Sequence, residues 1–475
     1  MKSISLGKIC AGTEFAFSAV LADKIITAVI TDSRQSAPGT LFVALKGERF
    51  DGHDFVPQVF EQGAEAALIC GDRVDALHEA LPAGHREKLI VVPDTLTALG
   101  QLAANLRSAL SIPVVGITGS VGKTSTKDLT ACAFSPLGRV ARTKLNFNNE
   151  IGLPMTVLTV EDTDSALIGE MGMRGLGEIE YLTNILRPDI GIITNIGVSH
   201  IERLGSRENI MLAKTEICSG MALGSTLLVA SGDRVITSEA ILERVASFHK
   251  DIQVKFFGLT SDCDYWADRI ETAPDGNVSF VFNPGGYSVS LNVAGVHNVS
   301  NALAALAAAD TYGIPLDQAI PCVESYRGDK IRQNIIRKDG ITIIDDTYNA
   351  GPESMQAALA VLGTLPGVQR KIAILGSMLE LGSASDDAHK AVCCAAEKND
   401  VDILITVGDT WGQSLSECRV KHKISCADWK EALCMCGDRV GPIGLEGDGI
   451  LVKGSHAMHM DNIVKALTKG EKNTK

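Results

Sequence analysis

The segment with the clearest chemistry reads TGSVGKT at residues 118–124 and follows a short β-branched run at residues 112–115. In a strand–loop–helix unit of this kind, backbone N–H groups at the helix start bind phosphate oxygens. The lysine reaches the terminal phosphates and the threonine hydroxyl ligates Mg²⁺. The strict GxxxxGK[ST] pattern would need glycine where this chain has Ile117, and a purely structural turn is the alternative. The residues predicted to bind the phosphates are Gly119, Ser120, Val121, Gly122, Lys123, Thr124 and Ser125.

Two polar residues follow apolar runs in the same region. Glu170 ends ALIGE, and His200 lies just past IGIITNIG. A carboxylate at a strand end suits Mg²⁺, although a lone charge there is more often solvated and a lone histidine is more often structural. Because both follow strands of one expected parallel sheet, we predict that Thr124, Glu170, His200 and Lys214 converge on one cleft.

Lys214 lies in the segment RENIMLAKTEICSG, which has the pattern of a helix. Apolar residues stand three and four positions to either side of it, so the lysine falls within the apolar stripe. A buried lysine is costly unless it is paired, neutralised or modified. The alternative is that its long side chain reaches solvent.

Asparagines are concentrated in two segments. RTKLNFNNEIGLP at residues 142–154 supplies either turn caps or neutral donors for a polar, anionic substrate. GVHNVSNALAA at residues 295–305 places Asn298 and Asn301 at the start of an alanine-rich helix, where capping is the alternative to ligand binding.

The elements that must position these residues have an α/β pattern. A length of 475 residues suggests about three domains. We predict a small α/β N-terminal domain (1–105), a central P-loop domain with a parallel sheet (106–325) and a C-terminal Rossmann-like domain (326–475). In the third domain, strands at 372–375, 403–407 and 451–452 each end in a glycine-bearing loop. Ligands of doubly wound sheets bind outside such strand ends.

Composition excludes several classes of protein. The formal net charge of −13 argues against non-specific nucleic-acid binding and against a polybasic membrane-surface protein. The sequence contains no run of eighteen uncharged apolar residues, so we expect no membrane span. Lys8 and Glu14 interrupt the apolar stretch that a signal peptide would need near the N-terminus. Twelve cysteines without a secretory signal fit reduced thiols, so we expect a cytoplasmic protein.

Together these segments resemble the Mur ligase family of ATP-dependent amide-forming enzymes. The similar segments are TGSVGKT (118–124), NFNNEIGLP (146–154), the Glu170 segment, ITNIGVSHIERLGSRENIMLAKTEI (193–217) and GVHNVSNALAA (295–305). TDSRQSAPGTLFVALKGERFDGHDF (31–55) resembles the family's nucleotide-sugar domain. IDDTYNAGPESMQAAL (344–359), ILGSMLELG (374–382) and VKGSHAMHMDNIV (452–464) most resemble the members that join D-alanyl-D-alanine to a UDP-N-acetylmuramoyl tripeptide.

The resemblance implies an acyl-phosphate mechanism with ATP and two Mg²⁺ ions, in a protein that we expect to be monomeric. Thr124 and Glu170 would hold one ion, and His200 with a carbamylated Lys214 would hold the other. Lys123, Lys214 and His200 would be the catalytic residues. The nucleotide would also contact Asn298, Arg332 and Asp346. The residues implied to bind the substrates are Ser33, Arg34, Thr143, Asn146, Asn148, Asn149, Tyr348 and Asn349.

Three alternatives stay open. Another amide ligase of the family, such as the tripeptide-forming one, would be expected to carry a DYAHTP-like segment where this chain has DTYNAGP. A P-loop switch protein or transporter ATPase would need a Walker-B aspartate. A dinucleotide-binding oxidoreductase would need GxGxxG after a strand and an acidic residue about twenty positions later.

Overall fold

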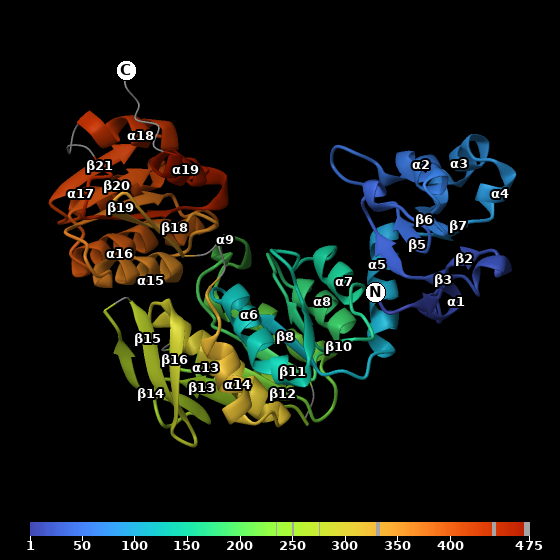
Figure 1. Cartoon of the computed structure of the whole chain (residues 1–475), viewed down its shortest axis with the longest axis horizontal. Helices are drawn as coiled ribbons and strands as arrows, with labels where there is room; N and C mark the ends of the chain where they lie inside the picture. Colours follow the sequence, from blue (N-terminus) through green and yellow to red (C-terminus); the bar gives the residue numbers. More distant parts are fainter. Residues whose placement is uncertain (234, 249–250, 275, 329–332, 439–442, 470–475) are drawn as a thin grey trace.

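The computed structural model describes residues 1–233, 235–248, 251–274, 276–328, 333–438 and 443–469. The chain forms three lobes in sequence order, coloured blue, green to yellow, and orange to red in Figure 1. Each lobe is built on its own larger sheet, covered by helices. The predicted α/β class is confirmed.

The first lobe has a five-stranded sheet of order β2-β7-β6-β5-β4, parallel except for β2, beside the small pair β1-β3. Its strands are β1 (Ile4–Ser5), β2 (Ala16–Phe17), β3 (Ile25–Ile26), β4 (Ala28–Ile30), β5 (Thr40–Val43), β6 (Ala66–Cys70) and β7 (Leu89–Val92). Its helices are α1 (Leu6–Ile9), α2 (Val56–Glu61), α3 (Val74–Ala80), α4 (Ala83–Arg86) and α5 (Thr95–Ser108).

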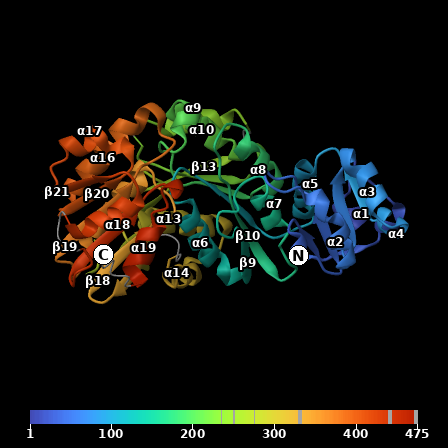
Figure 2. The ribbon, with the colours of Figure 1, turned by 90° about the horizontal axis from the view of Figure 1, so that it is seen from above.

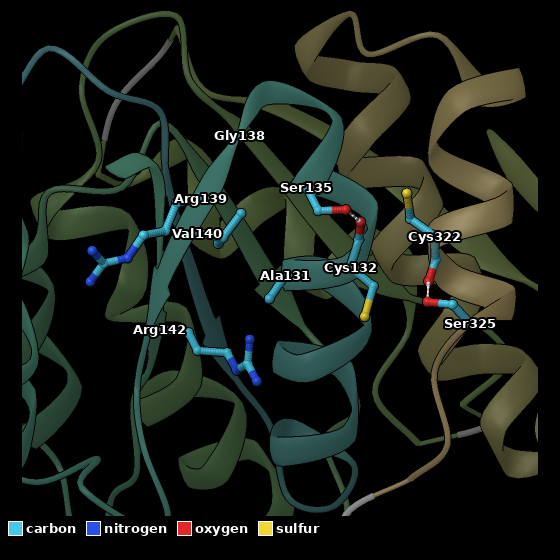
Figure 3. Close-up of a pocket in the computed structure, with 9 residues that line it drawn as sticks. All are labelled: Ala131, Cys132, Ser135, Gly138, Arg139, Val140, Arg142, Cys322 and Ser325. Carbon is cyan, nitrogen blue, oxygen red and sulfur yellow. Dashed lines mark hydrogen bonds between the residues drawn. The ribbon is translucent and has the colours of Figure 1, made fainter. Parts of the chain in front are cut away.

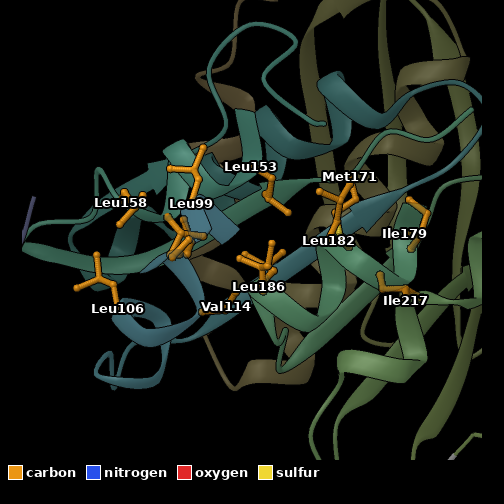
Figure 4. Packing of buried hydrophobic residues seen from close by; sticks show 14 of the residues in the cluster. Leu99, Leu106, Val114, Leu153, Leu158, Met171, Ile179, Leu182, Leu186 and Ile217 are labelled. Carbon is orange, nitrogen blue, oxygen red and sulfur yellow. The ribbon is translucent and has the colours of Figure 1, made fainter. Parts of the chain in front are cut away.

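Helix α5 joins the first lobe to the second. Its apolar face packs on α7 (Gly152–Val157) and α8 (Glu178–Leu186) of the central lobe. Leu99 and Leu106 lie in one buried cluster with Leu153 and Leu186 (Figure 4), and all four are fully buried. Burying a leucine contributes about 1.5–3 kcal/mol, so α5 holds the two lobes together through a continuous core. Our proposed boundary near residue 105 lies within this helix.

The central sheet has nine strands in the order β16-β15-β14-β13-β12-β11-β8-β10-β9. The strands are β8 (Val114–Thr118), β9 (Arg139–Arg142), β10 (Asp164–Glu170), β11 (Ile190–Ile193), β12 (Thr226–Ala230), β13 (Gln253–Gly258), β14 (Tyr265–Thr272), β15 (Asn277–Asn283) and β16 (Tyr287–Ala294). Besides α7 and α8, the helices are α6 (Lys123–Phe134), α9 (Ile201–Leu204), α10 (Arg207–Thr215), α11 (Ile217–Gly220), α12 (Ser238–Ala246), α13 (His297–Tyr312) and α14 (Leu316–Glu324). The central strand β8 lies between β10 and β11, and all three are parallel, so their carboxyl ends meet at one edge.

One part of the central lobe differs from our prediction. We predicted a parallel sheet for residues 106–325, but β14, β15 and β16 follow one another with no helix between them and pair antiparallel. The burial of β15 alternates strictly along NVSFVFN, as it does in a strand with one solvated face. In the sequence only residues 277–280 alternate between polar and apolar, because Val281 is apolar, so the signal for an antiparallel extension was partial.

The third lobe has a six-stranded sheet of order β17-β18-β22-β19-β20-β21, parallel except for β17. The strands are β17 (Asn334–Lys338), β18 (Ile341–Asp346), β19 (Arg370–Gly376), β20 (Ile403–Val407), β21 (His422–Cys426) and β22 (Asp448–Lys453). The helices are α15 (Pro352–Thr364), α16 (Ser385–Lys398), α17 (Gly412–Glu417), α18 (Trp429–Asp438) and α19 (Asp461–Lys469). Seen from above, this lobe lies against the central one, at the end away from the first lobe (Figure 2). Our second proposed boundary, near 325, follows the end of α14.

Helix length bears on the question of a membrane span. The alanine-rich helix α13 has 16 residues, and most of its side chains are buried in the core of the central lobe. Within the described ranges, no helix has the length and apolar character that a crossing requires.

Candidate active site

The predicted phosphate loop, residues 118–124, connects β8 to α6 at the middle of the central sheet. Ile117 lies buried inside β8, so the position where the strict pattern asks for glycine belongs to the strand. Gly122 has φ of +82° and caps α6, and a Cβ there would come within 2.6 Å of Asn301 Oδ1. A Cβ on Gly119 would lie only 1.8 Å from Thr194 Oγ1. Both glycines are therefore required by close packing around the loop.

Asn195, which sequence reasoning missed, holds the loop in place. Its Oδ1 accepts hydrogen bonds from the backbone N–H groups of Ser120 and Val121, each at 2.9 Å. Ser120 Oγ in turn accepts from the N–H of Gly197 at 2.9 Å. Lys123 Nζ donates across the loop to the carbonyls of Gly119 at 2.7 Å and Ser120 at 3.2 Å. The loop, its lysine and the segment after β11 thus form one hydrogen-bonded unit.

Glu170 ends β10 in a buried, polar setting. It is 1% exposed, and its Oε1 accepts from Asn148 Nδ2 at 2.9 Å. Its backbone N–H donates to the hydroxyl of the fully buried Thr143 at 3.0 Å. The second oxygen, Oε2, is buried and has no hydrogen-bond partner among the described residues. A buried carboxylate oxygen without a donor carries a large desolvation cost, and a bound cation would offset that cost.

Lys214 and His200 bring two further titratable groups to this region. Lys214 is 1% exposed, which confirms that it lies inside the apolar stripe of α10. Burial lowers the pKa of Lys214 well below its usual range, Lys123 lowers it further, and Glu353 opposes the shift. Burial also lowers the pKa of His200, Glu380 opposes this, and Lys123 and Lys214 add to it. The phosphate-loop lysine therefore helps to lower the pKa values of both groups.

The third lobe contributes two carboxylates to the segment after β11, and sequence reasoning singled out neither of them. Glu353, in the first turn of α15, accepts from the N–H of Val198 at 3.1 Å, and its other oxygen is buried without a described partner. Glu380, in the loop after β19, lies 2.6 Å from His200 Nδ1. These pairs are 155 and 180 residues apart in sequence, so only the tertiary fold joins them.

The helix that follows β16 also reaches the phosphate-loop region. Asn298 does not cap α13: Val296 is the N-cap, and Asn298 Nδ2 donates to the carbonyl of Ala294 at 2.8 Å from inside the first turn. Asn298 Oδ1 accepts from Asn301 Nδ2 at 3.1 Å, and Asn301 Oδ1 lies 3.2 Å from the Thr126 hydroxyl of α6. The capping interpretation was wrong for Asn298, because the helix begins one residue before it.

Asp346 forms a buried ion pair within the third lobe. Its Oδ2 accepts from the buried Lys453 Nζ at 2.6 Å, and the same Nζ donates to the carbonyl of Asn349 at 2.8 Å. The ring of Tyr348 lies 6.1 Å from that of His456, centroid to centroid. Arg332, which the resemblance implies contacts the nucleotide, lies outside the described residues.

The remaining predicted substrate residues lie on the first two lobes. Arg34 makes a fork-like pair with Asp32, with its side chain 85% exposed, and Ser33 is half-buried beside it. Asn149 Oδ1 accepts from the N–H of Gly152 at the start of α7, and Asn146 lies exposed in the same turn. Their roles in binding stay predictions.

A hollow of about 320 Å³ lies at the other end of α6, away from the phosphate loop (Figure 3). Its lining includes Cys132 of α6, Cys322 of α14 and two arginines of β9. Arg139 is paired with Glu161 and Asp164, and Arg142 is paired with Asp128. This hollow is separate from the predicted site and shares none of its residues.

Known protein families and proteins match this chain over almost its whole length. The profile of the Mur ligase family catalytic domain matches residues 25–107, that of the Mur ligase middle domain matches 117–309, and that of the Mur ligase glutamate ligase domain matches 331–456. A Bacillus subtilis protein named UDP-N-acetylmuramoyl-tripeptide–D-alanyl-D-alanine ligase is 37% identical over 93% of both chains. The crystal structure of MurF from Acinetobacter baumannii superposes with a TM-score of 0.84 at 30% identity over 99% of both chains. MurF ligase from Thermotoga maritima, solved in complex with ADP, gives a TM-score of 0.77 at 27% identity, covering 93% of this chain and 97% of that one.

Proposed function

The chain belongs to the Mur ligase family, and we propose that it joins D-alanyl-D-alanine to a UDP-N-acetylmuramoyl tripeptide at the expense of ATP. The names of relatives that match along nearly their whole length support this choice within the family. The tripeptide-forming ligase is the weaker candidate, because the third lobe carries DTYNAGP where that enzyme is expected to carry a DYAHTP-like segment.

The reaction begins when the terminal carboxylate of the tripeptide attacks the γ-phosphorus of ATP, which gives an acyl phosphate and ADP. Phosphate is a far better leaving group than oxide. The amine of D-alanyl-D-alanine attacks the acyl carbon, loses a proton, and the tetrahedral intermediate collapses to the amide and phosphate. Lys123 lies across the phosphate loop with Nζ on the carbonyls of Gly119 and Ser120. Its charge offsets the crowding of anions where ATP meets the carboxylate.

The site also fits Mg²⁺. Glu170 presents one buried oxygen that lacks a described partner, and Thr124, at the first turn of α6, is 4% exposed. These two residues would hold one ion, and His200 with a modified Lys214 would hold a second. When bound, Mg²⁺ neutralises phosphate charge and orients the transferring group. The chain would present these side chains from the start of α6, the end of β10, the residue before α9 and the last turn of α10.

Lys214 is proposed to carry a carbamate. Its burial favours the neutral amine, which reacts with CO₂, whereas an ammonium does not. The amine nitrogen bonds to the carbon of CO₂, one C=O π bond opens and the nitrogen releases a proton to solvent, so the product is a carbamate anion. The other way to stabilise a buried lysine is a salt bridge, but no ion pair joins Lys214 to a carboxylate within the described part of the chain, and Glu353 acts on its pKa only at longer range.

The proposal rests on one observation, which is that several functional groups occur together. The phosphate loop, a buried carboxylate at the end of β10 and a buried lysine of depressed pKa occur together in one lobe, and the third lobe docks two carboxylates beside them. This set of groups suits a reaction that joins a carboxylate to an amine and converts ATP to ADP and phosphate.

The test is a coupled ADP-release assay with each substrate alone and with both. We expect ADP release only when UDP-N-acetylmuramoyl tripeptide and D-alanyl-D-alanine are present together. ADP release with the UDP-linked dipeptide and a free diamino acid would assign the chain to the tripeptide-forming ligases. A rate of ATP hydrolysis that is the same with and without these substrates would favour a P-loop ATPase.

A further inference from the structure

The contact between His200 and Glu380 crosses two lobes and has unusual backbone geometry on both sides. Both residues have a left-handed backbone conformation, with φ of +64° at His200 and +62° at Glu380. Non-glycine residues adopt this conformation at a cost, and they keep it where the surrounding structure dictates it. The two strained residues face each other, with His200 Nδ1 and Glu380 Oε2 separated by 2.6 Å.

The loop that carries Glu380 is anchored from behind. The N–H of Met378 donates to Nε2 of the fully buried His389 at 3.2 Å, and the N–H of Leu379 donates to Ser455 Oγ at 3.0 Å. His389 Nδ1 donates to the carbonyl of Ser385 at 2.7 Å. These bonds fix the loop to α16 and to the end of β22, so Glu380 is held by the frame of the third lobe.

The loop is also seated on the central lobe beyond the carboxylate itself. The N–H of Glu202 lies 3.4 Å from the carbonyl of Glu380. Gly382 has φ of +51°, and a Cβ there would lie 3.2 Å from the side chain of Glu202. A backbone contact and a close approach therefore accompany the side-chain hydrogen bond and define where Glu380 meets α9.

The chemistry of the contact determines the tautomer of His200. An ionised carboxylate only accepts hydrogen bonds, so a neutral imidazole must place its proton on Nδ1 to pair with Glu380. Nε2 then carries a free lone pair. A carboxylate that accepts from one nitrogen of a histidine orients the ring and makes the other nitrogen a better ligand.

We propose that Glu380 is a positioning residue: it locks His200 in the Nδ1–H tautomer, and it does so only when the third lobe is docked on the central one. The catalytic consequence rests on the proposed function, because it is there that Nε2 of His200 serves as a ligand. The tautomer itself does not rest on it. Docking of the third lobe thus prepares a side chain of the central lobe for catalysis.

The direct test is the tautomer of His200 in the ligand-free, full-length protein. Histidine-selective ¹⁵N labelling and long-range ¹H–¹⁵N spectra at pH 8.5 distinguish a protonated Nδ1 from a protonated Nε2, and His200→Asn identifies the signals. We expect Nδ1–H in the parent chain and a shift toward Nε2–H in Glu380→Ala. In Glu380→Gln, whose amide both donates and accepts, we expect a mixture. Nε2–H in the parent chain, or unchanged Nδ1–H in Glu380→Ala, would overturn the proposal.

The second measurement is turnover with both substrates. We expect Glu380→Ala to lower kcat by about 10–100-fold with little change in the KM for ATP, as for other residues that orient a metal-binding histidine. The Mg²⁺ concentration needed for half-maximal rate should rise. Glu417→Gln, which removes an exposed carboxylate of the same lobe that pairs with Lys390, is the matched control and should leave both values unchanged.

The outcomes separate the two proposals. A tautomer shift with unchanged kcat would confirm that Glu380 positions His200 and would overturn the claim that this positioning serves catalysis. A parent chain that shows Nδ1–H but no ligase activity with the proposed substrates would overturn the proposed function and leave the tautomer assignment standing. Glu380→Gln keeps the volume of the side chain, so it provides the same comparison if the alanine variant folds poorly.

Discussion

Two buried lysines illustrate how differently the central and third lobes treat charge. Lys214 in α10 is 1% exposed and Lys453 at the end of β22 is 2% exposed. Lys453 donates to Asp346 at 2.6 Å and to the carbonyl of Asn349, so its charge is paired. Lys214 has no such carboxylate among the described residues and lies near a second cation, Lys123. Two equally buried lysines thus differ in their surroundings: Lys453 has a carboxylate partner, and Lys214 has a lowered pKa.

The difference lies in the neighbours, and the sequence pattern alone does not reveal it. A paired buried ion contributes to the fold because removing its partner leaves an uncompensated charge. An unpaired buried amine loses its proton and becomes a nucleophile. Variants of Lys214 and of the Lys453–Asp346 pair test whether the first affects activity and the second affects stability. Lys123→Ala serves as the reference for complete loss of activity.

Lys123→Ala sets the largest effect. We expect acyl-phosphate formation to be abolished, because Nζ lies on the loop that is proposed to cradle the phosphates. Thermal unfolding should stay close to that of the parent chain, since the side chain is only half-buried. Rapid-quench detection of the acyl phosphate measures the first effect, and normal turnover by a folded variant would refute the phosphate-loop assignment.

Lys214→Ala should lose most activity and keep its fold. A small carboxylic acid such as acetate, added to the assay, should restore part of the rate, because it replaces the anion that a carbamate would supply. Lys214→Met, which fills the same volume, is the control and should not respond to acetate in the same way. Full activity of Lys214→Ala would remove the carbamate from the mechanism.

The extent to which the site could be predicted follows from the sequence separation of its contacts. The phosphate loop was recognisable because strand, glycines, lysine and helix are contiguous, and the burial of Lys214 followed from helical spacing. Asn195, Glu353 and Glu380 were not recognisable, because each contacts the site across 74 to 180 residues. The antiparallel strands β14–β16 were missed, because the alternation in the sequence of β15 is only partial.

Breaking the paired lysine should affect stability first. We expect Asp346→Asn to destabilise the third lobe by about 3–5 kcal/mol, because Lys453 is left buried and unpaired. Hydrogen exchange of the β18 and β22 amides measures this loss within the intact chain. Breaking the exposed Lys390–Glu417 pair with Glu417→Gln should cost no more than about 1 kcal/mol. Equal losses in the two variants would contradict the structural role of Lys453.

The smallest expected effect is a change of shape. We expect the third lobe to move toward the central one when an ATP analogue and the UDP-linked substrate bind, because closure excludes water from the acyl phosphate. Small-angle scattering should show a slightly smaller radius of gyration with both ligands than with neither. Identical scattering profiles would mean that the docked arrangement, with Glu353 and Glu380 against the segment after β11, persists throughout the cycle.

The contact between α6 and α13 has a consequence for the order in which the protein forms on the ribosome. Thr126 of the helix behind the phosphate loop meets Asn301 across 175 residues, and Gly122 packs against the same asparagine. At roughly 5–20 residues per second, those residues take about 9–35 s to synthesise. During that interval the phosphate loop and α6 lack their contacts with Asn301 of α13. The packing around the phosphate loop is therefore complete only after translation has passed α13.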